Sequence, residues 1–185
     1  MKIKFSTYKT IYFFLMFLAT NIAYSQEKKW AAGIRIGEPA GLTIRKYLNN
    51  DENVLELNIG TYGAIWNGQK KYFGGEFRTV GLTFSGLYLW HNDVSKINGL
   101  KTYYGFGAQV NSRDYFVFKE TKLGKDVFDE FSSTSFGPCA IAGLEYFLNG
   151  DMPLSIFMEL GGYAEFYPAF FFARPQGGVG LRYNL

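Results

Sequence analysis

Apolar and polar side chains alternate with a period of two through most of the chain. In residues 53–66, Leu55 and Leu57 fall on one face of the segment, and Glu56 and Asn58 fall on the other. Such alternation predicts β-strands, and clusters of Gly, Asn, Asp and Pro separate one predicted strand from the next. Several segments exceed the roughly 9 to 11 residues that a tilted strand needs to cross a bilayer. The pattern predicts eight strands, at residues 30–37, 40–48, 53–66, 72–90, 100–113, 135–148, 153–173 and 177–185.

The connections between these segments differ in length on the two sides of the predicted sheet. Polar turns of short to moderate length, at 49–52, 91–99 and 149–151, fall on the side of the N-terminus. The longest predicted connection, 112–134, falls on the opposite side, although the connection at 37–40 on that side is tight. Short periplasmic turns and longer outer loops are typical of single-chain outer-membrane barrels.

One face of the predicted strands carries charge, and this face decides between two kinds of barrel. A soluble ligand-binding barrel has an apolar interior, whereas a small membrane barrel has a polar interior and an apolar exterior. Four basic and four acidic residues suit a lumen in which opposite charges pair, and Tyr88, Trp90 and Tyr104 suit an aromatic girdle on the apolar face. We therefore predict an all-β fold, an eight-stranded antiparallel up-and-down transmembrane β-barrel, with a periplasmic ligand-binding barrel as an alternative. The predicted lumen charges are Arg35, Arg45, Glu56, Lys101, Glu145, Glu159, Glu165 and Arg182.

The first residues of the chain have the pattern of a secretory signal peptide. Three lysines precede an apolar stretch at 11–19, and the small residues Ala23 and Ser25 precede a cleavage site. We expect a signal peptide at 1–25 and a barrel domain at 26–185. Cleavage removes the three lysines and changes the formal net charge from +3 to about zero, so the mature chain has no basic surface that indicates nucleic-acid binding.

Four stretches carry a resemblance to a known class of proteins. They are the hairpin at 33–43, the strand end at 86–92, the Tyr103-Tyr104-Gly105-Phe106-Gly107 run and the closing segment 178–183. With them, the chain resembles the small eight-stranded outer-membrane β-barrels, the OmpA/OmpX-like superfamily. This resemblance implies a fold and a location in the cell outer membrane. It implies no activity, because relatives include membrane anchors, host-interaction proteins and lipid-modifying enzymes.

Few residues offer catalytic chemistry. The barrel enzymes that act on lipids resemble one another in using histidine, serine and an acid near the outer leaflet, whereas His91, with Asp93 and Ser95, falls in a predicted periplasmic turn. Glu159 has arginines available to pair with it, and Cys139 lies in a predicted packed strand. One histidine and one cysteine cannot supply a usual zinc site. We therefore predict no enzymatic activity, no cofactor and no metal, with a lipid-active enzyme as the alternative.

The predicted outer loop at 112–134 has apolar side chains that a barrel does not require. Apolar residues in an exposed loop indicate a partner surface or a cap over the barrel mouth, and the alternative is that they extend the two flanking strands. We expect a structural or interaction role through this loop, with a closed lumen. The expected partners are outer-membrane lipid and a protein that binds the loop. The candidate contact residues are Tyr115, Phe116, Phe118, Val127, Phe128 and Phe131.

Overall fold

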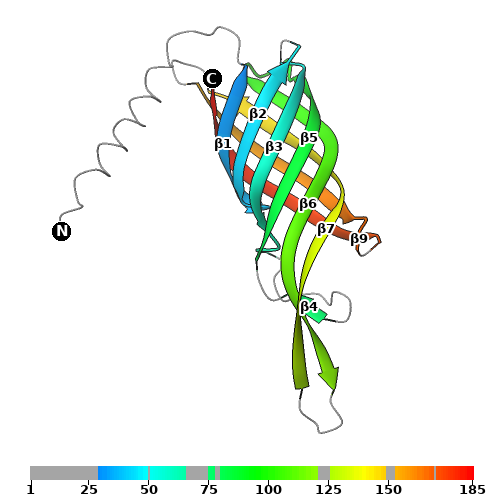
Figure 1. Ribbon diagram of the computed structural model, residues 1–185. Coiled ribbons are helices and arrows are strands. Elements are labelled where there is room, and N and C mark those ends of the chain that lie inside the picture. Colours follow the sequence, from blue (N-terminus) through cyan, green and yellow to red (C-terminus); the bar gives the residue numbers. More distant parts are fainter. Residues whose placement is uncertain are drawn as a thin grey trace, which may run out of the picture.

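Strands make up most of the part of the chain that the computed structural model describes (Figure 1). The predicted signal peptide at 1–25 lies outside this part and stays a prediction. Side chains are described except at 75–77, 116–120 and 126–130. The described residues are 29–49, 51–65, 75–77, 80–120, 126–148, 153–168 and 170–185.

Eight antiparallel strands close into a barrel. Each barrel strand pairs with the next along the chain, and the last strand pairs back with the first, from Ala31 opposite Asn184 to Glu38 opposite Gly177. A ninth, short strand, β4, pairs with β6 beyond the barrel. No helix in the described part of the chain is long and apolar enough to cross a membrane. The strands are β1 (Trp30–Glu38), β2 (Gly41–Leu48), β3 (Asn53–Tyr62), β4 (Gly75–Phe77), β5 (Gly81–Asp93), β6 (Leu100–Glu120), β7 (Asp126–Phe147), β8 (Leu154–Glu165) and β9 (Phe172–Asn184).

The two ends of the barrel differ. The start of β1, the ends of β2, β7 and β9 and the connection 94–99 lie at the upper end in Figure 1. The end of β3, the short strand β4, the end of β6 and the start of β7 lie at the other end. Because short turns of outer-membrane barrels face the periplasm, we call the first the periplasmic end and the second the outer end.

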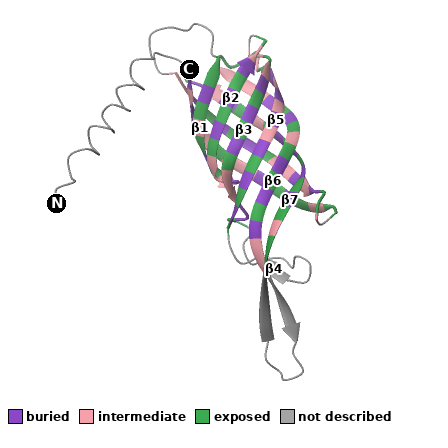
Figure 2. Cartoon of the chain, viewed as in Figure 1, coloured by how far each residue is buried: buried purple, intermediate pink, exposed green. Residues whose placement is uncertain are grey.

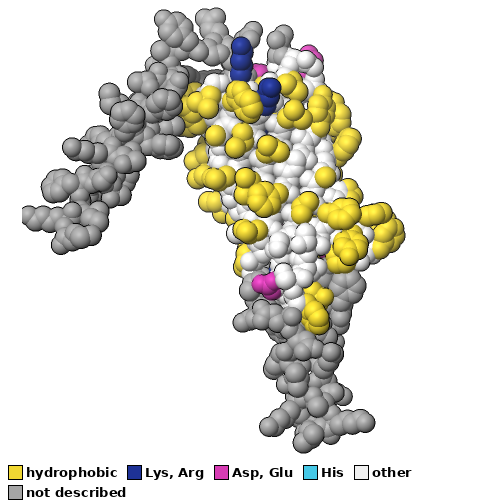
Figure 3. Space-filling view, in the orientation of Figure 1, with side chains coloured by type: hydrophobic (Ala, Val, Ile, Leu, Met, Phe, Trp, Pro, Cys, Tyr) yellow, Lys and Arg dark blue, Asp and Glu magenta, His cyan; other side chains and the backbone are white. Residues whose placement is uncertain are grey.

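The two faces of the sheet have opposite character, as the alternation predicts. Figure 2 shows buried and exposed residues alternating along the barrel strands on the side that faces the viewer. In β3, Leu57 points outward and is 60% exposed, whereas its neighbour Glu56 points inward and is 1% exposed. Hydrophobic side chains cover the wall in Figure 3, and the lysine and arginine side chains visible on that face lie at the periplasmic end. This arrangement confirms the transmembrane barrel and shows that the alternative of a soluble ligand-binding barrel is wrong.

An aromatic cluster marks the periplasmic end of the wall. The Trp90 ring stacks on that of Tyr104, with centroids 5.7 Å apart, and the Tyr88 ring meets Trp90 edge-on at 5.0 Å. These are the three residues predicted to form a girdle, and all three point outward from β5 and β6. Aromatic rings at this level suit the boundary between headgroups and acyl chains.

Two predicted strand boundaries are wrong. The segment 72–90 does not form one strand, because β4 pairs with β6 whereas β5 begins at Gly81. The segment 153–173 also ends early: Glu165 of β8 pairs with Phe172 of β9, so the aromatic stretch between them forms the turn. Aromatic residues favour strands by propensity, so alternation alone does not reveal where the chain reverses.

The predicted outer loop is largely strand. Pairing of β6 with β7 continues from Ser112 opposite Thr134 to Glu120 opposite Asp126. The two strands have 21 and 22 residues, about twice the roughly 9 to 11 needed to cross a bilayer. The prediction of a long loop at 112–134 is therefore wrong, and the alternative of extended strands describes the backbone. We call residues 114–120 and 126–132 the outer arm.

A charged side chain introduced into the middle of the barrel wall tests whether the apolar face points toward lipid. Leu57→Lys is expected to destabilise the barrel by roughly 2 to 4 kcal/mol if Leu57 lies near the bilayer midplane. Urea unfolding in lipid vesicles measures the change, with Leu57→Phe as the control that stays apolar. Equal stability of Leu57→Lys and the control would mean that this wall does not face lipid.

Candidate functional site

Four charged side chains form a closed ring inside the barrel. Arg45 of β2 donates from Nε to Glu56 of β3 and from Nη1 to Glu145 Oε2 of β7, the second at 2.5 Å. Arg182 of β9 donates to Glu56 Oε2 at 3.2 Å and to Glu145 Oε1 at 3.4 Å. None of the four is more than 1% exposed. Each arginine therefore bridges both carboxylates, and we call these four residues the lumen ring.

Neutral polar groups complete the hydrogen bonding of the two carboxylates. Ser155 Oγ donates to Glu145 Oε1 at 2.6 Å, and Asn58 Nδ2 donates to Glu56 Oε1 at 2.8 Å. A buried carboxylate is stable in its charged form only when such partners replace water. The surroundings of Glu56 and Glu145 thus favour ionised, structural carboxylates.

Aromatic rings cover the two guanidinium groups of the lumen ring. Arg45 Cζ lies 4.3 Å from the centroid of the Tyr103 ring, and Arg182 Cζ lies 3.4 Å from that of Phe157. Cation–π attraction strengthens when the cation is desolvated, as both arginines are. These contacts hold the flat guanidinium groups in one orientation.

A second ion pair joins the lumen ring on its outer side. Arg35 Nε lies 2.7 Å from Glu159 Oε1, and Tyr103 Oη donates to Glu159 Oε2 at 2.6 Å. Arg182 Nη2 lies 3.9 Å from the same Oε2, which connects the pair to the ring. A Cβ at Gly178 would lie 3.0 Å from Arg35 Nε, so glycine at this position leaves room for the arginine.

His91 belongs to the lumen and not to a turn. It lies in β5, is 6% exposed, and its Nε2 is 3.3 Å from Arg45 Nη1. Because arginine has no acceptor, His91 Nε2 accepts this hydrogen bond. Its ring meets those of Tyr47 and Tyr103 at centroid distances of 6.0 and 5.4 Å. The prediction of a polar turn at His91 is wrong, and continuing the alternation of β5 by one more step predicts the inward position.

Two of the eight predicted lumen charges lie apart from the lumen ring. Lys101 Nζ lies 3.5 Å from Asp93 at the periplasmic rim, where the Asp93 side chain is 80% exposed. Glu165 is buried at the outer end of β8. The other six predicted lumen charges lie within ion-pair distance of one another in one connected group: Arg35, Arg45, Glu56, Glu145, Glu159 and Arg182.

A network of uncharged polar side chains lies in the outer half of the lumen. Gln176 donates to Gln109 at 3.1 Å, and Gln109 donates to Asn111 at 2.8 Å. Asn111 and Tyr163 both donate to Ser135 Oγ, at 3.2 and 3.1 Å. The charge pattern did not single out these residues, although the alternation places them on the inner face.

The outer mouth of the barrel has its own polar contacts. Glu38 accepts from the backbone N–H groups of Gly63 and Ile65, at 2.5 and 3.0 Å. Arg113 is 4% exposed, and its Cζ lies 5.9 Å from the centroid of the Tyr62 ring. Arg113 therefore belongs to the barrel mouth, although it falls within the predicted loop.

The outer arm places two of the candidate contact residues side by side. Tyr115 stacks on Phe131, with centroids 5.7 Å apart and planes at 26°, and Phe131 is 42% exposed. The side chains of the other four candidates, Phe116, Phe118, Val127 and Phe128, lie outside the described ones. Within the described residues, no group of three or more His, Cys, Asp or Glu side chains could hold a metal ion.

Comparisons with solved structures show the same barrel in outer-membrane proteins. The N-terminal β-barrel domain of Pseudomonas aeruginosa OprF is similar at a TM-score of 0.57 and 16% identity, over 86% of this chain and 100% of that domain. Neisserial surface protein A is similar at a TM-score of 0.52 and 12% identity, over 84% of this chain and 95% of the other. No protein-family model and no curated protein matches the sequence.

These findings define the class of protein. The fold is that of the small eight-stranded outer-membrane β-barrels, which confirms the resemblance seen in the sequence. An apolar exterior and an interior that buries ion-paired charges make the chain an integral membrane β-barrel of the outer-membrane type.

The lumen ring is expected to contribute strongly to stability. Arg45→Ala leaves Glu56 and Glu145 with one arginine between them, and the expected loss is roughly 3 to 5 kcal/mol. Urea unfolding in vesicles, followed by the gel shift between folded and heated barrel, measures it. Lys101→Ala is the control, because an ion pair open to solvent is worth about 0 to 1 kcal/mol. Equal losses in the two variants would show that the ring does not stabilise the fold.

Proposed function

We propose that this barrel is a non-enzymatic outer-membrane protein with a closed lumen, and that it acts by binding a protein partner through its outer arm. The observation that carries the proposal is the length of β6 and β7, because the other barrel strands have 8 to 13 residues. The additional residues exceed the length that a strand needs to cross a bilayer, and surface segments positioned by a rigid scaffold are typical sites of recognition.

The backbone of the outer arm supports one mode of binding. β6 is paired on both sides, with β4 at 115–117 and with β7. β7 pairs with β8 only from Cys139 onward, apart from a single bridge at Phe136. Among the described residues, the edge of β7 at 126–134 therefore faces no further strand. An edge of this kind can accept a strand from another protein.

The lumen supports the absence of catalysis and of conduction. Glu56, Glu145 and Glu159 each contact an arginine, so each is paired as a structural carboxylate and none is free to act as a general acid. An eight-stranded barrel is only wide enough for side chains to fill it, and the lumen ring joins four of its strands. The alternative of a lipid-active enzyme would need reactive groups near the outer leaflet, whereas His91 lies near the periplasmic end.

A closed lumen predicts that the barrel does not conduct ions. The purified wild-type protein in planar bilayers is expected to show no stable conductance, because buried ion pairs block the path. Bilayers that receive the same detergent without protein provide the baseline. A steady single-channel current above that baseline would contradict the closed lumen.

Shortening the outer arm tests the interaction role. Replacing 115–131 by Asn-Gly keeps the pairing of Asp114 with Ser132 and supplies a two-residue hairpin turn. The shortened barrel is expected to assemble and to shift on heating as the wild type does. A photo-crosslinking residue at Ser132, which is exposed, is expected to give a discrete adduct on intact cells with the long arm only.

A crosslinker at Asn92, exposed at the periplasmic rim, is the matched control and should not give this adduct. The proposal fails if the shortened barrel gives the same adduct, because the arm is then not the binding surface. It also fails if the shortened barrel does not assemble, because the arm is then a structural element.

A further inference from the structure

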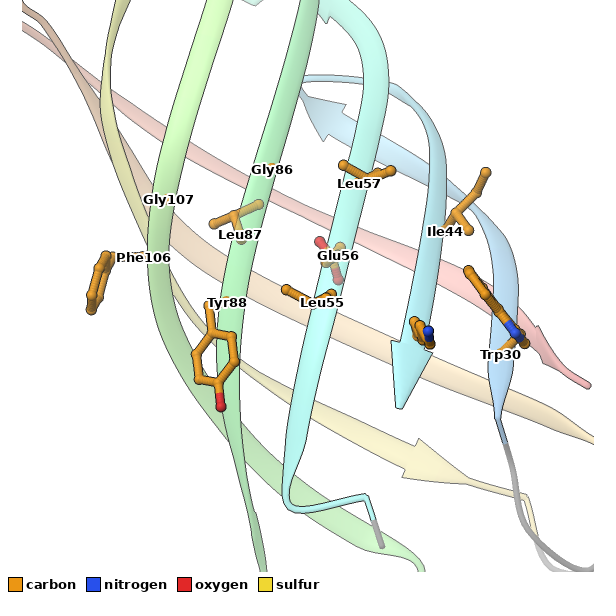
Figure 4. Close-up of a pocket in the computed structure, with 11 residues that line it drawn as sticks. Trp30, Ile44, Leu55, Glu56, Leu57, Gly86, Leu87, Tyr88, Phe106 and Gly107 are labelled. Atoms are coloured by element: carbon orange, nitrogen blue, oxygen red, sulfur yellow. The ribbon is translucent and has the colours of Figure 1, made fainter. Parts of the chain in front are cut away.

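A groove in the membrane-facing wall crosses β2, β3, β5 and β6 (Figure 4). Its volume is about 510 Å³, within the range of roughly 300 to 1,000 Å³ that holds small ligands. Outward-pointing apolar side chains surround it. They are Trp30, Ile44, Leu55, Leu57, Tyr88 and Phe106.

Gly86 creates the depth of this groove. It occupies an outward position of β5 and pairs with Ala108 of β6, so two small residues lie side by side where their neighbours are large. A Cβ at Gly86 would meet only Leu57 Cδ2, at 3.6 Å, which is an ordinary contact. At Gly107, by contrast, a Cβ would overlap the backbone of Gly86. The barrel can therefore accommodate a side chain at Gly86, and the groove is not a consequence of close backbone packing.

A positive charge lies at the periplasmic end of the groove. The side chain of Lys46 carries this charge. Among the described barrel strands, leaving out the outer arm, the charged side chain that points outward from the wall is that of Lys46. It pairs with Trp30 on one side and Leu55 on the other, and its Nζ lies 5.4 Å from the centroid of a Trp30 ring. Glu56 also borders the groove, but its carboxylate is buried in the lumen ring and does not neutralise Lys46.

We propose that the groove binds one phospholipid of the periplasmic leaflet, with the phosphate on Lys46 and an acyl chain across Gly86. Lys46 lies two residues before the periplasmic end of β2, so we place its ammonium group at the level of the lipid headgroups. Trp30 and Tyr88 border the same end of the groove, and tryptophan and tyrosine are enriched at this level of a membrane. The long apolar trough suits a hydrocarbon chain, and the single cation at its end suits a phosphate. This site is independent of the outer arm and of the proposed protein partner.

Native mass spectrometry of the full barrel in mild detergent, titrated with phosphatidylglycerol, tests the site. The wild type is expected to retain one phospholipid. Gly86→Leu fills the groove and Lys46→Gln removes the charge, and each is expected to weaken binding about tenfold. Lys46→Arg is expected to retain binding. Lys46→Gln changes only an exposed side chain, so this variant is expected to assemble. Its binding of phosphatidylglycerol therefore tests the site even if Gly86→Leu does not assemble.

Two matched variants control for general effects. Gly162→Leu adds the same side chain at an outward glycine of β8, where a Cβ meets its nearest atom at 3.4 Å, and no lysine lies beside it in the wall. Lys96→Gln removes an exposed lysine from the periplasmic turn. Both are expected to bind phosphatidylglycerol as the wild type does. Diacylglycerol, which lacks the phosphate, is expected to bind the wild type about tenfold more weakly than phosphatidylglycerol does. The Lys46→Gln substitution is expected to leave the affinity for diacylglycerol unchanged.

Three results would overturn the proposal. Equal binding by the wild type, Gly86→Leu and Lys46→Gln would mean that lipid covers the wall without a specific site. An equal loss in Gly162→Leu would mean that any addition to the wall weakens binding. A barrel dimer that Gly86→Leu removes, with no bound phospholipid, would assign the groove to a second copy of the chain.

Discussion

The pairing of β1 with β9 closes the sheet, and the other features of this protein depend on that closure. A strand edge in the hydrocarbon of a bilayer would expose unpaired N–H and C=O groups, each of which costs several kcal/mol. The pairing of β1 with β9, from Ala31 opposite Asn184 to Glu38 opposite Gly177, leaves neither of these two strands with an unpaired edge. Closure also separates the side chains into an outer set that contacts lipid and an inner set that must fill a narrow lumen.

The narrow lumen explains the form of the lumen ring. Charged side chains there lose their water, so each must meet opposite charges and further hydrogen-bond donors. Arg45 and Arg182 each bridge Glu56 and Glu145, and the four come from β2, β3, β7 and β9. Strands that are not neighbours in the sheet are thereby joined across the barrel. Such an interior is suited to stability, and the proposed binding surfaces therefore lie on the outside of the barrel.

Two outer surfaces have features that the barrel itself does not need. The outer arm projects beyond the membrane with the edge of β7 available to a partner, and the groove at Gly86 lies within the membrane. The two differ in chemistry as well as in place. Backbone hydrogen bonding dominates at the arm, whereas the groove offers an apolar trough with one lysine. The two proposed binding sites therefore do not overlap.

The sequence alone determined the number of barrel strands, their two faces and the membrane setting, although not every strand boundary, because side chains in a strand alternate strictly and the bilayer demands an apolar exterior. It also predicted the polarity of the lumen. Only the tertiary structure decided which charges meet, since Arg45 and Glu145 are brought together by barrel closure and not by spacing. The same holds for the contact of His91 with Arg45, for the paired arm at 112–134 and for the groove at Gly86. Each depends on register between strands, and register is a property of the folded sheet that no single strand's pattern contains.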